Sequence, residues 1–271
     1  MRAGALPALF HFSGSGRFSS MSTGILSAMA QEQAGLAGRL DEVRVERYAG
    51  REFHVGRWHG RGVVLALSRI GKVAAATTAA ALIERFGVSR IVFTGVASGL
   101  HPDVRVGDTV IGTEFVQHDM DASPIFPRYE VPLYDRSRFL ADTTLSRCLA
   151  QAVQAVLSDP SLIDAATRRH FGLAQPQRMH HGLIASGDRF VSGPGEAATL
   201  RAALPQALAV EMEAAAVAQV CFDHGVPFAA VRNISDRADE TAHVDFDAYI
   251  QEVAGIQARA LIAALLPLLP P

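Results

Sequence analysis

The chain has 271 residues, of which 49 % are hydrophobic and 19 % are charged, and its formal net charge is −2. This composition supplies ample material for a core and lacks the signature of an intrinsically disordered chain. There is no clustered basic segment that would bind nucleic acid, and no apolar run of about 18 residues that would span a membrane. The sequence therefore predicts a globular protein that binds neither nucleic acid nor a membrane. We expect it to be cytoplasmic.

Residues 1–20 differ in composition from the rest of the chain. They are rich in Gly, Ser and Phe, with two arginines and no acidic residue. We expect them to form a disordered extension before a single domain at residues 21–271, because neither an internal repeat nor a linker follows. Cys148 and Cys221 lie in apolar, helix-like segments, which favours two buried free thiols. No spacing of histidines and cysteines indicates a metal site.

From residue 21 onward, short apolar runs alternate with helical patterns. The runs predict strands at residues 24–28, 43–49, 52–58, 62–68, 90–95, 109–118, 181–187, 207–211 and 228–235. The helical patterns lie at residues 74–86, 139–157, 196–203, 212–224 and 246–266. The remaining segments include a small-residue loop at 96–99 and a long loop at 119–138. This alternation predicts one α/β domain, with a central mixed, mostly parallel sheet flanked by helices.

In such folds the ligand lies beyond the carboxyl ends of the strands. That rule selects five segments: residues 28–32, 94–99, 186–192, 211–213 and 235–239. They carry four carboxylates, Glu32, Glu211, Glu213 and Asp236. We expect these carboxylates to converge on one pocket.

A set of carboxylates suits cleavage of a bond between ribose and a base. One carboxyl protonates the leaving group while a second positions water, as in glycosidases. Burial and neighbouring carboxylates keep an acid protonated near neutral pH. Each residue also has a structural explanation: Asp236 could cap a turn, Glu213 could begin a helix, and Met212 could fill the core.

Seven strings occur in an order that makes the sequence recognisable. They are Gly24-Ile-Leu-Ser-Ala-Met-Ala-Gln-Glu32, Gly71-Lys-Val-Ala-Ala75, Thr94-Gly-Val-Ala-Ser-Gly-Leu100, Val106-Gly-Asp-Thr-Val110, Ser186-Gly-Asp-Arg-Phe190, Val210-Glu-Met-Glu-Ala214 and Val231-Arg-Asn-Ile-Ser-Asp236. Between about residues 21 and 266 the chain resembles the 5′-methylthioadenosine/S-adenosylhomocysteine nucleosidases of the purine nucleoside phosphorylase superfamily.

The resemblance implies irreversible hydrolysis of the N-glycosidic bond, without metal or organic cofactor, as part of methionine salvage. It implies that Asp236 is the general acid that protonates adenine at N7, and that Glu32 activates water. It makes Glu213 the carboxylate that binds the ribose hydroxyls. The other substrate-binding residues that we expect are Ala97, Ser98, Phe190, Val191, Glu211, Met212, Arg232, Ser235 and Phe246.

The resemblance also implies a homodimer in which the long loop of one subunit closes the pocket of its neighbour. Ile125, Phe126 and Pro132 are the loop residues that we expect in the partner's pocket. The sequence departs from the family's usual pattern at Val96, which replaces a hydroxyl residue, and at Ser98, which adds one. The range of accepted 5′ substituents, including S-adenosylhomocysteine, stays open.

Two alternatives fit the same fold. A phosphorylase would use phosphate in place of water and would need basic residues around that anion. The segment after the first predicted strand has no arginine and contains Glu32, which would repel phosphate. A non-catalytic nucleoside-binding protein is the second alternative, since a fold does not fix a function.

Overall fold

The computed structural model describes residues 21–173, 176–238 and 242–271, without the side chains of residues 242–245. The predicted extension at residues 1–20 lies outside this range. The strands are β1 Ser22–Ser27, β2 Asp41–Tyr48, β3 Arg51–Trp58, β4 Arg61–Leu67, β5 Arg90–Gly99, β6 Thr109–Gln117, β7 Arg138–Leu140, β8 Met179–Ser186, β9 Ala207–Glu211 and β10 Phe228–Asp236. The helices are α1 Lys72–Glu84, α2 Thr143–Leu157, α3 Ala165–His170, α4 Pro194–Ala203, α5 Ala214–His224, α6 Ala242–Tyr249 and α7 Gly255–Leu265.

All the strands among the described residues belong to one ten-stranded mixed sheet, in the order β10-β6-β8-β9-β5-β1-β4-β3-β2, with β7 on β6. Parallel pairing joins β4, β1, β5 and β10 in one run, and β6, β8 and β9 in another. Antiparallel pairs β10–β6 and β5–β9 connect the two runs, so strands β5, β9, β8, β6 and β10 close into a ring. This ring brings strand ends from both halves of the chain to one place.

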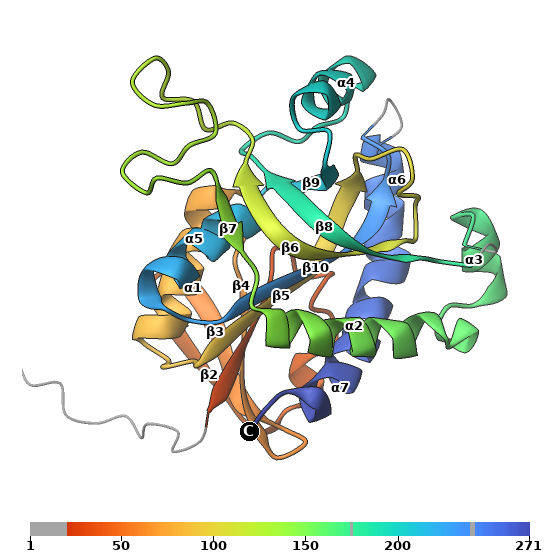
Figure 1. The fold of residues 1–271 in the computed structure, drawn as a ribbon. Coiled ribbons are helices and arrows are strands. Elements are labelled where there is room, and N and C mark those ends of the chain that lie inside the picture. The colour runs from red at the N-terminus through yellow and green to blue at the C-terminus, as the bar shows by residue number, and fades with distance from the viewer. Residues whose placement is uncertain (1–20, 174–175, 239–241) are drawn as a thin grey trace, which may run out of the picture.

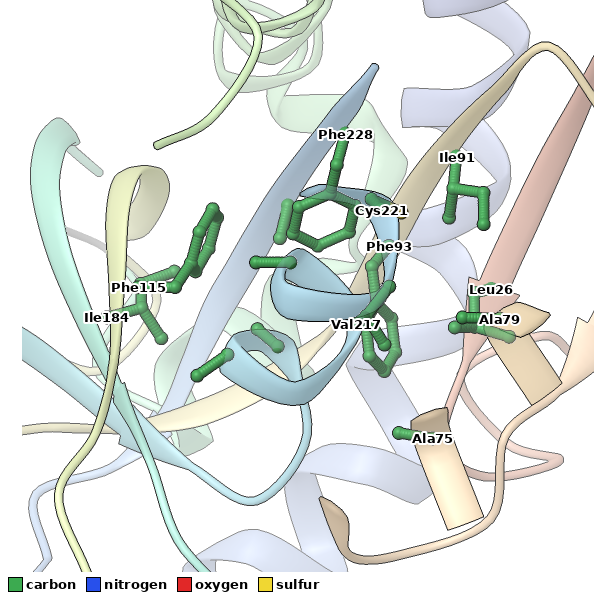
Figure 2. Close-up of a cluster of buried hydrophobic side chains, with 14 of the residues drawn as sticks. Leu26, Ala75, Ala79, Ile91, Phe93, Phe115, Ile184, Val217, Cys221 and Phe228 are labelled. Carbon is green, nitrogen blue, oxygen red and sulfur yellow. The ribbon is translucent and has the colours of Figure 1, made fainter. Parts of the chain in front are cut away.

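Helices cover both faces of the sheet (Figure 1). A hydrophobic core lies on each face of the sheet. Neighbouring residues of β1 and β5 belong to different cores, because successive residues of a strand point to opposite faces. Leu26 and Phe93 pack with α1 and α5, whereas Ile25 and Val92 pack with α2 and α7. Figure 2 shows the first of these cores, where Phe93 lies between the side chains of the two helices. The predicted α/β architecture is confirmed.

Both cysteines are buried free thiols, as predicted. Cys148 packs with the α2 and α7 side of the core and Cys221 with the α1 and α5 side. Burial raises the pKa of the Cys221 thiol to about 12. No described helix has the length and apolar character to cross a membrane.

Several predicted boundaries were wrong. The loop predicted at residues 96–99 is the end of β5, because these residues pair with β10 and β9. The helix predicted from residue 139 begins at Thr143, where Asp142 caps it, and residues 138–140 pair with β6 instead. The predicted C-terminal helix starts earlier, at Ala242, and a π-helical turn at Ile250–Ala254 divides it into α6 and α7.

Candidate active site

A cavity of about 350 Å³ lies at the carboxyl ends of β1, β5, β9 and β10. Most of the predicted site residues line it, namely Glu32, Ala97, Ser98, Phe190, Val191, Glu211, Met212, Glu213, Asp236 and Phe246. The structure thus brings together residues that lie up to about 200 positions apart in the sequence, as the rule for strand ends predicts.

Glu32 is almost completely buried, and backbone amides fix its carboxylate. Oε2 accepts hydrogen bonds from the amides of Ala28 (2.8 Å) and Met29 (2.9 Å), and Oε1 accepts one from Val96 (2.9 Å). Burial raises the pKa of Glu32, although these amides and Arg232 favour its charged form. A fixed carboxylate with a raised pKa is suited to take a proton from water near neutral pH.

Asp236 ends β10 on the wall of the same cavity and is fully buried. Its Oδ2 accepts a hydrogen bond from the Ser235 hydroxyl (2.8 Å), and its Oδ1 accepts one from the Ala238 amide (2.9 Å). The turn-capping bond that the sequence suggested is therefore present, and Asp236 also lines the cavity.

Glu213 lies at the junction of β9 and α5, where its backbone precedes the first helical residue. Its Oε1 accepts a hydrogen bond of 2.8 Å from the amide of Gly71, at the start of α1. Burial and the neighbouring charge of Glu211 raise the pKa of Glu213 to about 8. The buried carboxyls of Glu32 and Glu213 offer hydrogen-bonding groups to a polyol such as ribose.

Glu211 and Arg232 form a buried ion pair of 2.8 Å beside the cavity. The guanidinium also donates to the carbonyl of Phe93 (3.1 Å) and lies over its ring, 4.1 Å from the centroid. Glu211 in turn accepts a hydrogen bond from the Ser186 hydroxyl. Buried charges need such partners, since an unpaired one is strongly destabilising.

Arg232 and Ser235 do not line the cavity, although we expected both to bind substrate. Arg232 is directed into the core by Glu211 and Phe93. Ser235 donates to Asp236. Each of the two side chains thus holds a carboxylate that lines the cavity.

Aromatic and apolar side chains form the remaining wall. The rings of Phe190 and Phe246 meet edge to face, with centroids 5.6 Å apart. Phe190 is 40 % exposed, so its ring is accessible to a flat ligand. Met212, Val191 and Ile70 extend the apolar surface. This wall suits an aromatic base and an apolar substituent.

Six lining residues were not named as site residues from the sequence, namely Ala28, Met29, Ile70, Val96, Arg189 and Val210. All of them except Ile70 and Val210 lie in segments that the strand-end rule selected. The sequence reasoning also gave no role to Gly71, although that glycine lies in a quoted string. Its φ of +97° is a signal that only the structure reveals, because such a backbone favours glycine and points the amide at Glu213. Within the described residues, Ile125, Phe126 and Pro132 do not line the cavity of their own chain.

Comparison with known proteins agrees with this geometry. The family model of the phosphorylase superfamily matches residues 22–267. The 5′-methylthioadenosine/S-adenosylhomocysteine nucleosidase of Shewanella denitrificans is 37 % identical over 91 % of this chain and 99 % of its own. The chain belongs to this nucleosidase family.

Solved structures support the same assignment. The nucleosidase of Neisseria meningitidis, in complex with methylthio-immucillin-A, has a TM-score of 0.80 and 33 % identity, covering 92 % of this chain and 99 % of its own. The futalosine hydrolase of Helicobacter pylori has a TM-score of 0.76 and 32 % identity, covering 90 % of this chain and 97 % of its own. Solved proteins with this fold are thus named for more than one substrate.

Proposed function

We propose that this enzyme hydrolyses the N-glycosidic bond of 5′-methylthioadenosine, and of S-adenosylhomocysteine, to adenine and a 5-thio-substituted ribose. The observation that carries the proposal is the placement of two buried carboxyls, Glu32 and Asp236, on one cavity with an aromatic wall. The names of the similar nucleosidases support the substrate class.

In the proposed reaction, Asp236 donates a proton to N7 of adenine while the bond between C1′ and N9 breaks. The bonding electron pair leaves with the base, and the sugar becomes cation-like. Glu32 takes a proton from water, whose oxygen forms the new bond to C1′. Exchange of protons with solvent returns both carboxyls to their starting states.

The other lining residues bind the two parts of the substrate. Phe190 stacks on adenine, and the backbone of Val191 lies at the edge of the base. Glu213 binds the ribose hydroxyls, and Met212 packs on the sugar. Phe246 contacts the 5′-thio substituent. Each role uses a residue on the cavity wall and the chemistry of its side chain or backbone.

The charges around the cavity favour water over phosphate as the nucleophile. Four of the described lining residues are acidic, namely Glu32, Glu211, Glu213 and Asp236, and one, Arg189, is basic. The Arg189 side chain is 73 % exposed and pairs with Glu196 at 3.1 Å. A phosphate ion would meet a negative wall without the cluster of cations that it needs.

We further propose a homodimer in which the loop between β6 and β7 covers the partner's cavity. The support is exposed apolar surface on this loop and beside the cavity. Ile125 and Leu133 of the loop are 82 % and 87 % exposed, and Ile70 on the cavity wall is 55 % exposed. A second copy that buried these side chains would remove apolar area from water. Cytoplasmic location and methionine salvage stay predictions.

The test is release of free adenine from a panel of 5′-substituted adenosines, with and without phosphate. We expect phosphate-independent release of adenine and a free sugar from 5′-methylthioadenosine. A sugar 1-phosphate that forms only with phosphate would identify a phosphorylase. Tight binding without turnover of any compound would identify a binding protein.

A further inference from the structure

The chain contains a single lysine, Lys72, among 25 basic residues. It occupies the first position of α1, and its side chain is only 15 % exposed. The position therefore uses an ammonium group where the rest of the chain uses guanidinium groups. These groups differ in shape, because an ammonium is compact and donates in three directions whereas a guanidinium is a planar fork.

Lys72 closes a ring of three hydrogen-bonded residues. Its Nζ donates to Oδ1 of Asp119 at 2.6 Å. Oδ2 of Asp119 accepts from the amide of Asp188 at 2.9 Å, and Oδ1 of Asp188 accepts from the amide of Lys72 at 2.8 Å. The ring fastens the start of α1 to the end of β6 and to the segment between β8 and α4.

The ring adjoins the cavity on two sides. Gly71, the residue before Lys72, donates its amide to Glu213. Asp188 precedes Phe190 by two residues, and Phe190 lies on the cavity wall. A shift of Lys72 would therefore displace the Gly71 amide that donates to Glu213. It would also displace the segment that carries Phe190.

The surroundings of the ammonium suit a compact cation. Besides Asp119, Nζ has Oε1 of Gln117 at 3.1 Å and Oδ2 of Asp188 at 3.9 Å. Gln117 is itself fixed, since its amide donates to Gln219 of α5 at 2.8 Å. Burial opposes the charge on Asp119, yet Lys72 and the Asp188 amide hold the pKa of Asp119 below its usual value.

We propose that Lys72 is a positioning residue that holds the sugar-side carboxyl of Glu213 and the base-side ring of Phe190 in register across the cavity. This inference rests on the proposed function, which gives those two residues their ligands. Lys72 acts through Asp119, Asp188 and the Gly71 amide and touches neither reacting atom. Glu32 and Asp236 lie on other strand ends and keep their own hydrogen bonds.

The first test is the kinetics of Lys72→Met and Lys72→Arg with 5′-methylthioadenosine. We expect Lys72→Met to raise KM roughly tenfold and to change kcat less, because misplaced binding groups can cost up to about 100-fold. We expect Lys72→Arg to retain thermal stability through its charge but to raise KM by an intermediate factor. Asp119→Asn should resemble Lys72→Met, and the double variant should be little worse than either, since both break one ring.

Arg47→Met is the control, because it removes an ion pair of 2.8 Å, to Glu52, on the β2–β3 hairpin outside the cavity. It should leave KM unchanged. Loss of folded protein alone would lower the amount of active Lys72→Met without changing its KM. The proposal is overturned if folded Lys72→Met keeps KM within about twofold of the wild-type value, a difference too small for lost positioning.

A second measurement uses the single lysine directly. Labelling with ¹⁵N-lysine gives one backbone amide resonance, from the group that donates to Asp188. We expect this resonance to shift when adenine binds and the Phe190 segment adjusts, and to stay fixed when inorganic phosphate is added at the same ionic strength. No shift at saturating adenine contradicts the coupling. A wild-type enzyme that releases no adenine contradicts the proposed function instead.

Discussion

The backbone of Gly95 packs against the carboxylate of Glu32. A β-carbon at position 95 would be 2.6 Å from Oε1 of Glu32, closer than such atoms approach. The absence of a side chain at Gly95 lets the carboxylate reach the amide of Val96 on β5. We expect Gly95→Ala to displace Glu32 and to lower kcat by about 100-fold, the scale of misplacing a group that positions a reactant. Adenine release measures the effect, and Gly38→Ala, whose β-carbon would meet nothing within 4 Å, is the control.

Asp236→Asn is expected to lower turnover by roughly two orders of magnitude or more, the scale of losing a general acid. The amide retains the size of the carboxyl, so adenine binding should change little. Asp164→Asn is a suitable control, because Asp164 caps α3 and asparagine caps helices equally well. Near-normal turnover by Asp236→Asn would rule out its assignment as the acid.

The raised pKa of Glu213 predicts how the stability of the ligand-free protein depends on pH. Its folded pKa of about 8 lies above the unfolded value of 4.5, so the folded state binds the extra proton between these values. The contribution of this proton to the free energy of unfolding is fully present below pH 4.5 and is lost as the pH rises toward about 8.

Burial lowers the pKa of His118 from 6.5, so its contribution to stability rises with pH and is nearly complete above about pH 7. Melting temperatures are therefore compared between pH 7 and 8. The wild-type melting temperature should fall across this range, and Glu213→Gln should flatten the decline because glutamine cannot ionise. Glu196→Gln serves as the control for loss of a carboxylate outside this cavity. An unchanged slope in Glu213→Gln would mean that another group titrates.

Glu213→Gln should also weaken both substrate binding and turnover, since a hydrogen bond to a charged group is worth about 1.5–3 kcal/mol. A 3′-deoxy substrate should then lose little further activity in the variant. If the two losses simply add, the carboxyl and the hydroxyl are not in contact.

Ile125→Ala tests the loop that we place over the partner's cavity. Ile125 is more exposed than the partly buried Phe126 and Pro132, which makes it the best probe of the three. We expect KM for 5′-methylthioadenosine to rise more than KM for adenosine, by a factor equivalent to about 1–3 kcal/mol of lost apolar contact. Val45→Ala, an exposed residue on the far edge strand β2, should change neither. A fully active monomer in sedimentation analysis would contradict the shared cavity.

The sequence predicted the architecture well because strand and helix patterns are local properties. The end of α5 illustrates this, since Gly225, with a φ of 63°, closes the helix directly after residue 224, where the predicted helix ended. Boundaries were predicted less well. The segment at 138–140 joined β6 because a strand partner from elsewhere in the chain outweighed its local helical pattern.

For the site, the sequence by itself determined which carboxylates stand at strand ends, since the order of strands and helices fixes that in any parallel sheet. It did not determine which side chains face the cavity. Arg232 turns into the core because Glu211 and Phe93 meet it there, and these partners lie 21 and 139 residues away in the sequence. Only the tertiary structure decided the ring of Lys72, Asp119 and Asp188, whose members are separated by 47 and 116 residues. Hydrogen bonds over such separations depend on the closure of β5 and β10 onto β9 and β6, which no local pattern encodes.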